Sequence, residues 1–191
     1  MTASPTHVII GDSVPSMRIP LFALVLVLGS LMIGAGQSPT DAKLQAQLNQ
    51  LFPAATAFSP KAGDPPHFKA YIHAAQSSQP TLAGFAFWTT ELEPLERGYD
   101  GPIKVLVGMD THGILTGILV VEHHEPYGYF SVDPPAFRAQ FKGKSIRDSF
   151  RVGNDIDAVS TATLTVTSAT RAVRNGARRV ARQFLTPEAL R

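Results

Sequence analysis

One long apolar run stands out near the N-terminus of the chain. Residues 19–35 read IPLFALVLVLGSLMIGA, carry no charged side chain and follow Arg18. As a helix, this segment would be about 25 Å long, the short end of what spans a bilayer. It predicts either a cleaved signal peptide or an uncleaved membrane anchor. The anchor is favoured because Ile33 spoils the small-x-small cleavage pattern that would end at Ala35. Both interpretations export the rest of the chain.

Two short segments after this run show apolar residues at helical spacing. Within residues 40–52, three leucines recur at i, i+4 and i+7, which predicts a short amphipathic helix. These are Leu44, Leu48 and Leu51. Further on, Phe137 and Phe141 lie four residues apart and predict a short helix that stops at Gly143.

The clearest helical pattern lies at the C-terminal end, from about Ser168 to Phe184, with Thr167 or Ser168 as the N-cap. Its apolar face consists of Val173, Ala177, Val180, Ala181 and Phe184. A separate basic face consists of Arg171, Arg174, Arg178 and Arg182. This start places Arg171 and Arg174 in the first turns, near the positive end of the helix dipole, where a phosphate would meet both.

The middle of the chain is rich in β-forming residues. Residues 68–74 and 82–89 each predict a strand, and residues 103–109 and 114–121 predict a hairpin closed by a turn over residues 110–113. The predicted class is α+β, with a twisted antiparallel sheet flanked by helices and preceded by one N-terminal transmembrane or signal helix. We therefore expect two parts, a signal or anchor over residues 1–37 and one domain over residues 38–191.

Composition narrows the chemistry. The chain has no cysteine, which excludes disulfides, iron–sulfur clusters, thiolate zinc sites and cysteine nucleophiles. Seventeen basic residues oppose fifteen acidic ones, and the resulting net charge of +2 is far from that of a dedicated nucleic-acid binder. We expect no nucleic-acid partner.

A cluster of polar residues, Glu122-His123-His124-Glu125, follows the second strand of the predicted hairpin. If the strand continues, the two histidines point to opposite faces and cannot chelate one ion together. We therefore expect a cluster that lines a pocket or hydrogen-bonds locally, and no metal site.

The last informative segment is Asp157-Ala158-Val159-Ser160-Thr161-Ala162-Thr163. It resembles the D-x-x-S/T-G-A-T motif of the FMN-binding domain family, which includes the RnfG and NqrC subunits and the N-terminal domain of NosR/NirI-type regulators. Other matching segments extend the resemblance over roughly residues 48–184, and the NosR/NirI version is the most similar. They include Gly98–Ile103, Gly108–Asp110, Gly113–Gly117, Glu122–Pro126 and Arg178–Arg182.

The resemblance implies an exported domain that carries electrons on FMN. In this family a flavin transferase of ApbE type moves FMN from FAD to a threonine hydroxyl, and the matching residue here is Thr163. The implied cofactor site comprises the motif residues Asp157, Ser160, Thr161, Ala162 and Thr163, with Arg171 or Arg174 near the phosphate and with His124 in a segment that borders the flavin pocket. Candidate neighbours of the flavin ring are Phe87, Trp88, Tyr127 and Tyr129. We expect no catalytic residue that turns over a small substrate.

Two departures from the family pattern keep alternatives open. Thr161 stands where the motif usually has glycine, and the chain lacks the cysteines with which NosR/NirI-type proteins hold iron–sulfur clusters. Electrons would therefore pass to and from a membrane redox complex or other electron-transfer proteins. The expected location is the bacterial inner membrane with the domain in the periplasm, or the periplasm itself if the leader is cleaved. The alternatives are a flavin-free structural or assembly subunit that retains the fold, and a periplasmic module with non-covalent FMN.

Overall fold

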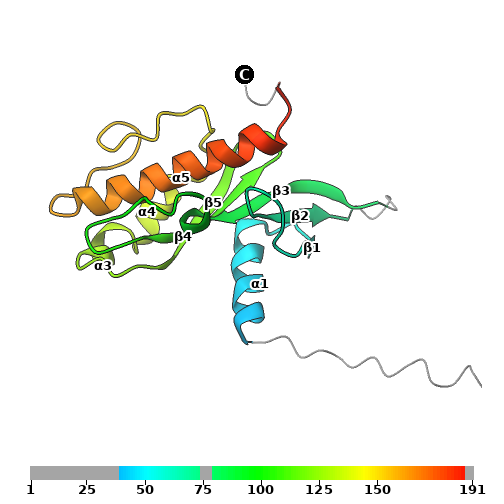
Figure 1. The fold of residues 1–191 in the computed structure, drawn as a ribbon, viewed down its shortest axis with the longest axis horizontal. Helices are drawn as coiled ribbons and strands as arrows, with labels where there is room; N and C mark the ends of the chain where they lie inside the picture. The colour runs from blue at the N-terminus through cyan, green and yellow to red at the C-terminus, as the bar shows by residue number, and fades with distance from the viewer. Residues whose placement is uncertain (1–38, 74–78, 188–191) are drawn as a thin grey trace, which may run out of the picture. The chain divides into compact units, whose positions relative to one another are not determined.

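A five-stranded antiparallel sheet organises the residues that the computed structural model describes, 39–73 and 79–187 (Figure 1). The strands lie side by side in chain order, so each pairs with its sequence neighbour. They are β1 (Ala57–Phe58), β2 (Phe68–Ile72), β3 (Thr81–Trp88), β4 (Lys104–Asp110) and β5 (Leu115–Glu122). The predicted α+β class with an antiparallel sheet is confirmed, although the short strand β1 was not predicted.

The hairpin of β4 and β5 is confirmed where the sequence predicts it. The carboxylate of Asp110 accepts the backbone N–H groups of His112 and Ile114, at 2.8 and 2.9 Å. Gly113 adopts φ +78°, a conformation that glycine reaches without steric cost. The turn is therefore held by one aspartate and one glycine.

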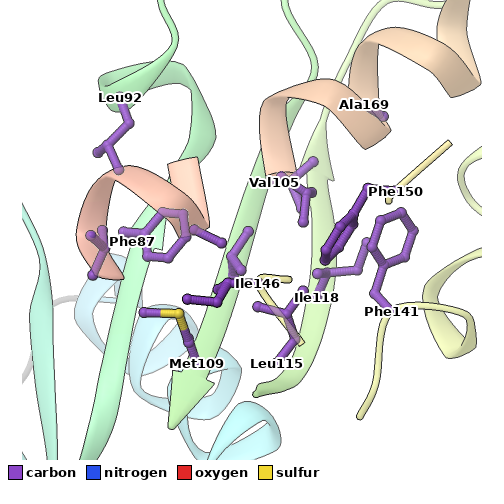
Figure 2. Packing of buried hydrophobic residues seen from close by; sticks show 14 of the residues in the cluster. Phe87, Leu92, Val105, Met109, Leu115, Ile118, Phe141, Ile146, Phe150 and Ala169 are labelled. Atoms are coloured by element: carbon purple, nitrogen blue, oxygen red, sulfur yellow. The ribbon is translucent and has the colours of Figure 1, made fainter. Parts of the chain in front are cut away.

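Helix α5 (Thr163–Phe184) covers one face of the sheet. Its buried side chains, among them Ala169 and Val173, pack against Phe87 and Val105 of the sheet and against Phe141 and other residues of the segment after β5 (Figure 2). Small residues dominate the buried stripe of α5. They let the helix lie close to the sheet, where large side chains such as Phe87 and Met109 fill the remaining space.

Helix α1 (Pro39–Leu51) covers the opposite face. Leu48 and Leu51 pack against Leu106 and Trp88, which confirms the predicted amphipathic helix. Because both faces of the sheet are covered, β4 is apolar almost throughout. Its residues alternate between the two cores, with Val105 on the side of α5 and Leu106 on the side of α1.

Three short helices complete the described part of the fold: α2 (Thr89–Leu92), α3 (Gly128–Ser131) and α4 (Pro135–Ala139). Only α4 was predicted, from the spacing of Phe137 and Phe141, and both rings are buried and pack edge to face. Helices α2 and α3 have four residues each, too few for a periodic pattern to appear in the sequence.

The predicted start of the C-terminal helix was wrong. The helix begins at Thr163, five residues before Ser168, and Ala162 rather than Thr167 or Ser168 is its N-cap. Threonine is a poor helix former, and its density here favours a loop. Tertiary contacts override that preference, because Val166 and Ala169 are fully buried in the core only if this stretch is helical.

The predicted signal or anchor, residues 1–37, lies outside the described residues. Within residues 39–73 and 79–187, none of the helices has the length and apolar character needed to cross a bilayer. The proposed boundary between residues 37 and 38 stays a prediction.

Candidate functional site

The motif residues form a loop that leads directly into α5. Asp157 and Ser160 are exposed, whereas Ala162 is buried. The backbone N–H of Asp157 donates to Oε1 of Gln140 at 2.7 Å, which ties the start of the loop to the segment after α4. The motif is therefore a surface loop with one buried anchor at Ala162.

Thr161 adopts the backbone conformation that the motif's glycine would take. Its φ is +65°, in the left-handed region, and its hydroxyl donates to the carbonyl of Ser160 at 2.6 Å. A β-branched residue in this region carries strain of about 1–3 kcal/mol, whereas glycine carries none. The substitution keeps the backbone path and adds bulk next to Ala162.

Thr163 is the first residue of α5, and its side chain is exposed. Its hydroxyl makes only a long contact, 3.4 Å, with the carbonyl of Val159. The first N–H groups of a helix have no acceptor inside the helix, and Ala162 provides no side-chain cap for them. An accessible hydroxyl thus stands beside backbone N–H groups and the positive end of the helix dipole, an arrangement that suits a phosphate.

Arg171 and Arg174 do not lie in the first turn, as the sequence predicted. Because the helix starts at Thr163, a rise of about 1.5 Å per residue places them roughly 12 and 17 Å along its axis. Arg171 donates to Oε1 of Glu96 at 2.8 Å, and Arg174 donates to Asn175 at 3.2 Å. Their placement beside the helix N-terminus is therefore corrected, and Arg171 is engaged with an acidic residue.

The polar cluster after β5 hydrogen-bonds locally, as the sequence predicted. Nδ1 of His123 accepts the backbone N–H of Glu125 at 3.1 Å, so Nε2 carries the ring proton and donates to Asp133 at 2.8 Å. His124 is exposed, and β5 ends at Glu122 before either histidine. Among the described residues, no three histidine, aspartate or glutamate side chains lie close enough to hold a metal ion.

Glu125 is the residue of this cluster whose role the sequence did not reveal. It is 6% exposed, and its carboxylate accepts the backbone N–H groups of Tyr99 and Asp100, at 3.0 and 2.9 Å. It also accepts the hydroxyl of Thr165, which is itself buried. One carboxylate thus joins the loop before β4, the segment after β5 and the first turn of α5. The matching of both Gly98–Ile103 and Glu122–Pro126 to one family was the only sequence signal that related two of these segments.

The large apolar side chains that the described residues expose gather around the same three segments. They are Leu95, Tyr99, Tyr127, Tyr129 and Leu164. Leu164 lies next to Thr163, Tyr99 is bonded through its N–H to Glu125, and Leu95 precedes the Glu96 that pairs with Arg171. Phe87 and Trp88, also candidate neighbours of a flavin, are instead buried in the two cores. Tyr127 and Tyr129 are the candidates that remain at the surface.

A second carboxylate organises the loop that precedes the motif. Asp155 accepts the N–H groups of Arg151 and Phe150, the hydroxyl of Ser149 and the ammonium of Lys144, at 2.6 to 3.0 Å. Burial raises the pKa of this carboxyl, but these four donors outweigh burial and hold its pKa well below the ordinary value. Asp155 therefore stays ionised and fixes the loop two residues before Asp157.

The comparisons with known proteins agree with this site. Residues 98–178 match the model of the FMN-binding domain family. Over 84 residues the chain is 30% identical to the RnfG-type subunit of the Na⁺-translocating ferredoxin:NAD⁺ oxidoreductase complex of Acetobacterium woodii, which covers 40% of this chain and 41% of that protein. Over 88 residues it is 33% identical to the corresponding subunit of the ion-translocating oxidoreductase complex of Vibrio vulnificus, covering 41% and 42% of the two chains.

The α+β fold with an exposed threonine at the start of its longest helix is thus that of a flavin-binding domain. Residues 98–178 are an FMN-binding domain of the RnfG/NqrC-like kind, which confirms the resemblance seen in the sequence. The matches span about two fifths of the length of these relatives. The closer resemblance to NosR/NirI-type domains stays a prediction.

The residues present fit FMN. Thr163 offers an accessible hydroxyl at a helix start without a side-chain cap, which suits the phosphate, and Tyr127, Tyr129 and Leu164 offer exposed apolar surface, which suits a flat ring system.

Proposed function

We propose that the chain is a membrane-anchored, exported flavoprotein that carries FMN on Thr163 and relays electrons between partner redox proteins. The observation that carries this proposal is the position of Thr163. Its hydroxyl is exposed at the first residue of α5, within the motif and inside the segment that matches the FMN-binding domain. The proposal is of a cofactor carrier, so no residue is assigned a role in turnover of a small substrate.

Attachment of FMN to Thr163 requires a flavin transferase of ApbE type and FAD. The threonine oxygen bonds to the phosphorus of the FMN half of FAD, the bond from that phosphorus to the bridging oxygen breaks, AMP leaves and the hydroxyl proton is lost. The product is a phosphoester that joins the side chain to FMN. A covalent link keeps the cofactor on an exported protein, from which a free flavin would diffuse away.

The chain's own residues would bind and orient the group. The backbone N–H groups at the start of α5 would hold the phosphate, and Ala162 leaves room beside it. Exposed apolar side chains, Tyr127 and Leu164 among them, would flank the ring. Bound FMN supplies the electron-transfer chemistry, and the protein supplies attachment, orientation and surroundings.

The proposed partners follow from the kind of protein that the chain resembles. Both relatives are named as subunits of ion-translocating oxidoreductase complexes. We therefore propose a membrane redox complex, or separate electron-transfer proteins, as donor and acceptor. The proposed location is the bacterial inner membrane with the domain in the periplasm, because residues 19–35 form an uncharged apolar run.

A second candidate function is a structural or assembly subunit that has kept the fold without the flavin. Thr161 favours it, because a β-branched residue at φ +65° adds bulk two residues before Thr163. If the unchanged chain takes up no FMN and Thr161→Gly does, the bulk of Thr161 prevents attachment. Colourless protein that co-purifies with a larger complex would support this alternative.

The deciding experiment is intact mass of the full chain made in a host with an active flavin transferase. The expected result is a gain of one FMN less one water, which is lost in Thr163→Val and kept in the matched variant Thr167→Val. No gain in the unchanged chain, together with no flavin absorbance in the complex isolated from its own membrane, would overturn the proposal. A flavin that is released on denaturation would favour the non-covalent alternative.

A further inference from the structure

We infer that Glu125 is a positioning residue for flavin attachment, which rests on the proposed function. Its carboxylate holds Thr165 and, through it, the first turn of α5, so that Thr163 faces outward as the acceptor hydroxyl. It holds the Tyr99 loop in place at the same time.

The first step is the burial and bonding of the Glu125 carboxylate. Both oxygens accept hydrogen bonds: Oε1 from the N–H of Asp100, and Oε2 from the N–H of Tyr99 and the hydroxyl of Thr165. No ion pair is formed by Glu125 in the part of the chain that the structure describes. Three donors therefore hold a buried acid in place of a counter-ion, and each of them would be left unpaired if an oxygen were removed.

The second step is the space that the chain leaves around this carboxylate. A Cβ at Gly98 would meet the Glu125 side chain, with its Cδ 2.7 Å away. A Cβ at Gly128 would meet the ring of His123, the same ring that accepts the N–H of Glu125. Two glycines from different segments thus admit Glu125 and its supporting histidine. Neither glycine has a positive φ, so close approach rather than backbone conformation explains them.

The third step is the effect on the choice of acceptor. Threonine recurs at every second position from 161 to 167, so α5 begins with several hydroxyls. Thr165 is 3% exposed and donates its hydroxyl proton to Glu125, which leaves it inaccessible to a transferase. Residues two apart on a helix point about 200° apart, so burying Thr165 turns Thr163 outward. Glu125 therefore selects Thr163 by fixing the rotation of the first turn.

The test compares variants that break the contact with variants that keep it. Thr165→Val removes the hydroxyl at nearly constant volume, and Thr165→Ser restores it. Glu125→Gln places an amide group where one N–H donor needs an acceptor. The matched controls are Thr167→Val, two residues further along α5, and Glu91→Gln, a surface carboxylate on α2 paired with Lys61. Each full chain is incubated with FAD, Mg²⁺ and a purified flavin transferase, below the lowest melting temperature of the set.

The initial rate of mass gain is the readout, together with the residue that carries the added mass. The expected result is a rate about tenfold lower or less for Thr165→Val and Glu125→Gln, with Thr165→Ser and both controls within about twofold of the unchanged chain. If Glu125→Gln does not fold, the valine and serine pair at position 165 decides alone. Equal rates for that pair, with normal attachment to the unchanged chain, would overturn this inference only. No attachment to the unchanged chain would overturn the proposed function and this inference with it.

Discussion

Thr163 and Thr165 lie two residues apart at the start of α5, yet the side chain of Thr163 is exposed and that of Thr165 is buried. The buried hydroxyl donates to Glu125, whereas the exposed one makes only a long contact with the carbonyl of Val159. Two chemically identical side chains are thus separated by their tertiary surroundings. Substitutions in the segments that create those surroundings have measurable consequences.

Replacing Thr161 by glycine is expected to raise the free energy of unfolding by about 1 kcal/mol. The change removes strain of about 1–3 kcal/mol at φ +65°, offset in part by the greater freedom of glycine in the unfolded chain. Urea denaturation of the full chain measures this difference. Thr167→Gly, inside α5, is the control and should lower stability by about 1 kcal/mol. Equal or lower stability of Thr161→Gly would show that this backbone position is not strained.

Replacing Asp155 by asparagine is expected to lower stability at neutral pH by about 1 kcal/mol, a modest value because solvent partly screens the pair with Lys144. The folded-state pKa of Asp155 lies below its unfolded value, so its contribution is present above the unfolded pKa and is lost as the pH falls through the folded pKa. Stability of the two proteins should therefore converge on acidification below about pH 4. Urea midpoints from pH 7 to pH 2.5 test this, and a constant difference across that range would contradict it.

Gly98→Ala is expected to destabilise the protein by about 1–3 kcal/mol, because the added Cβ would displace the Glu125 carboxylate and leave buried donors unpaired. Thermal unfolding measures the change. The exposed neighbour, Arg97→Ala, is the control and should have little effect. If Gly98→Ala is as stable as the control, the carboxylate has room to move and is not tightly held.

Tyr127→Ala is expected to shift the visible absorption of attached FMN without changing the mass gain. An aromatic side chain that packs on the ring alters its surroundings, and Tyr127 is exposed beside α3. Leu95→Ala, on the loop before β4, provides a control that is also exposed and has no aromatic ring. Identical spectra for Tyr127→Ala and the unchanged chain would remove Tyr127 from the flavin's neighbours.

Much of the fold could be predicted because its signals are local. The leucine spacing over residues 40–52 and the β-rich runs around the turn at residues 110–113 each lie within one element, and the structure confirms both. The start of α5 could not be predicted, because the propensities of Thr163, Thr165 and Thr167 oppose a helix there. Burial of Val166 against the sheet outweighs those propensities, and that contact is not visible in the sequence.

The sequence by itself determined the antiparallel sheet, the apolar stripe of α5 and the motif that contains Thr163, because alternation and short-range spacing are properties of neighbouring residues. Only the tertiary structure decided which hydroxyls are accessible. Glu125 meets Asp100 from 25 residues away and Thr165 from 40 residues away, and no periodicity relates positions so far apart. The same folding that buries Thr165 moved the start of α5 to Thr163 and left Arg171 and Arg174 far along its axis.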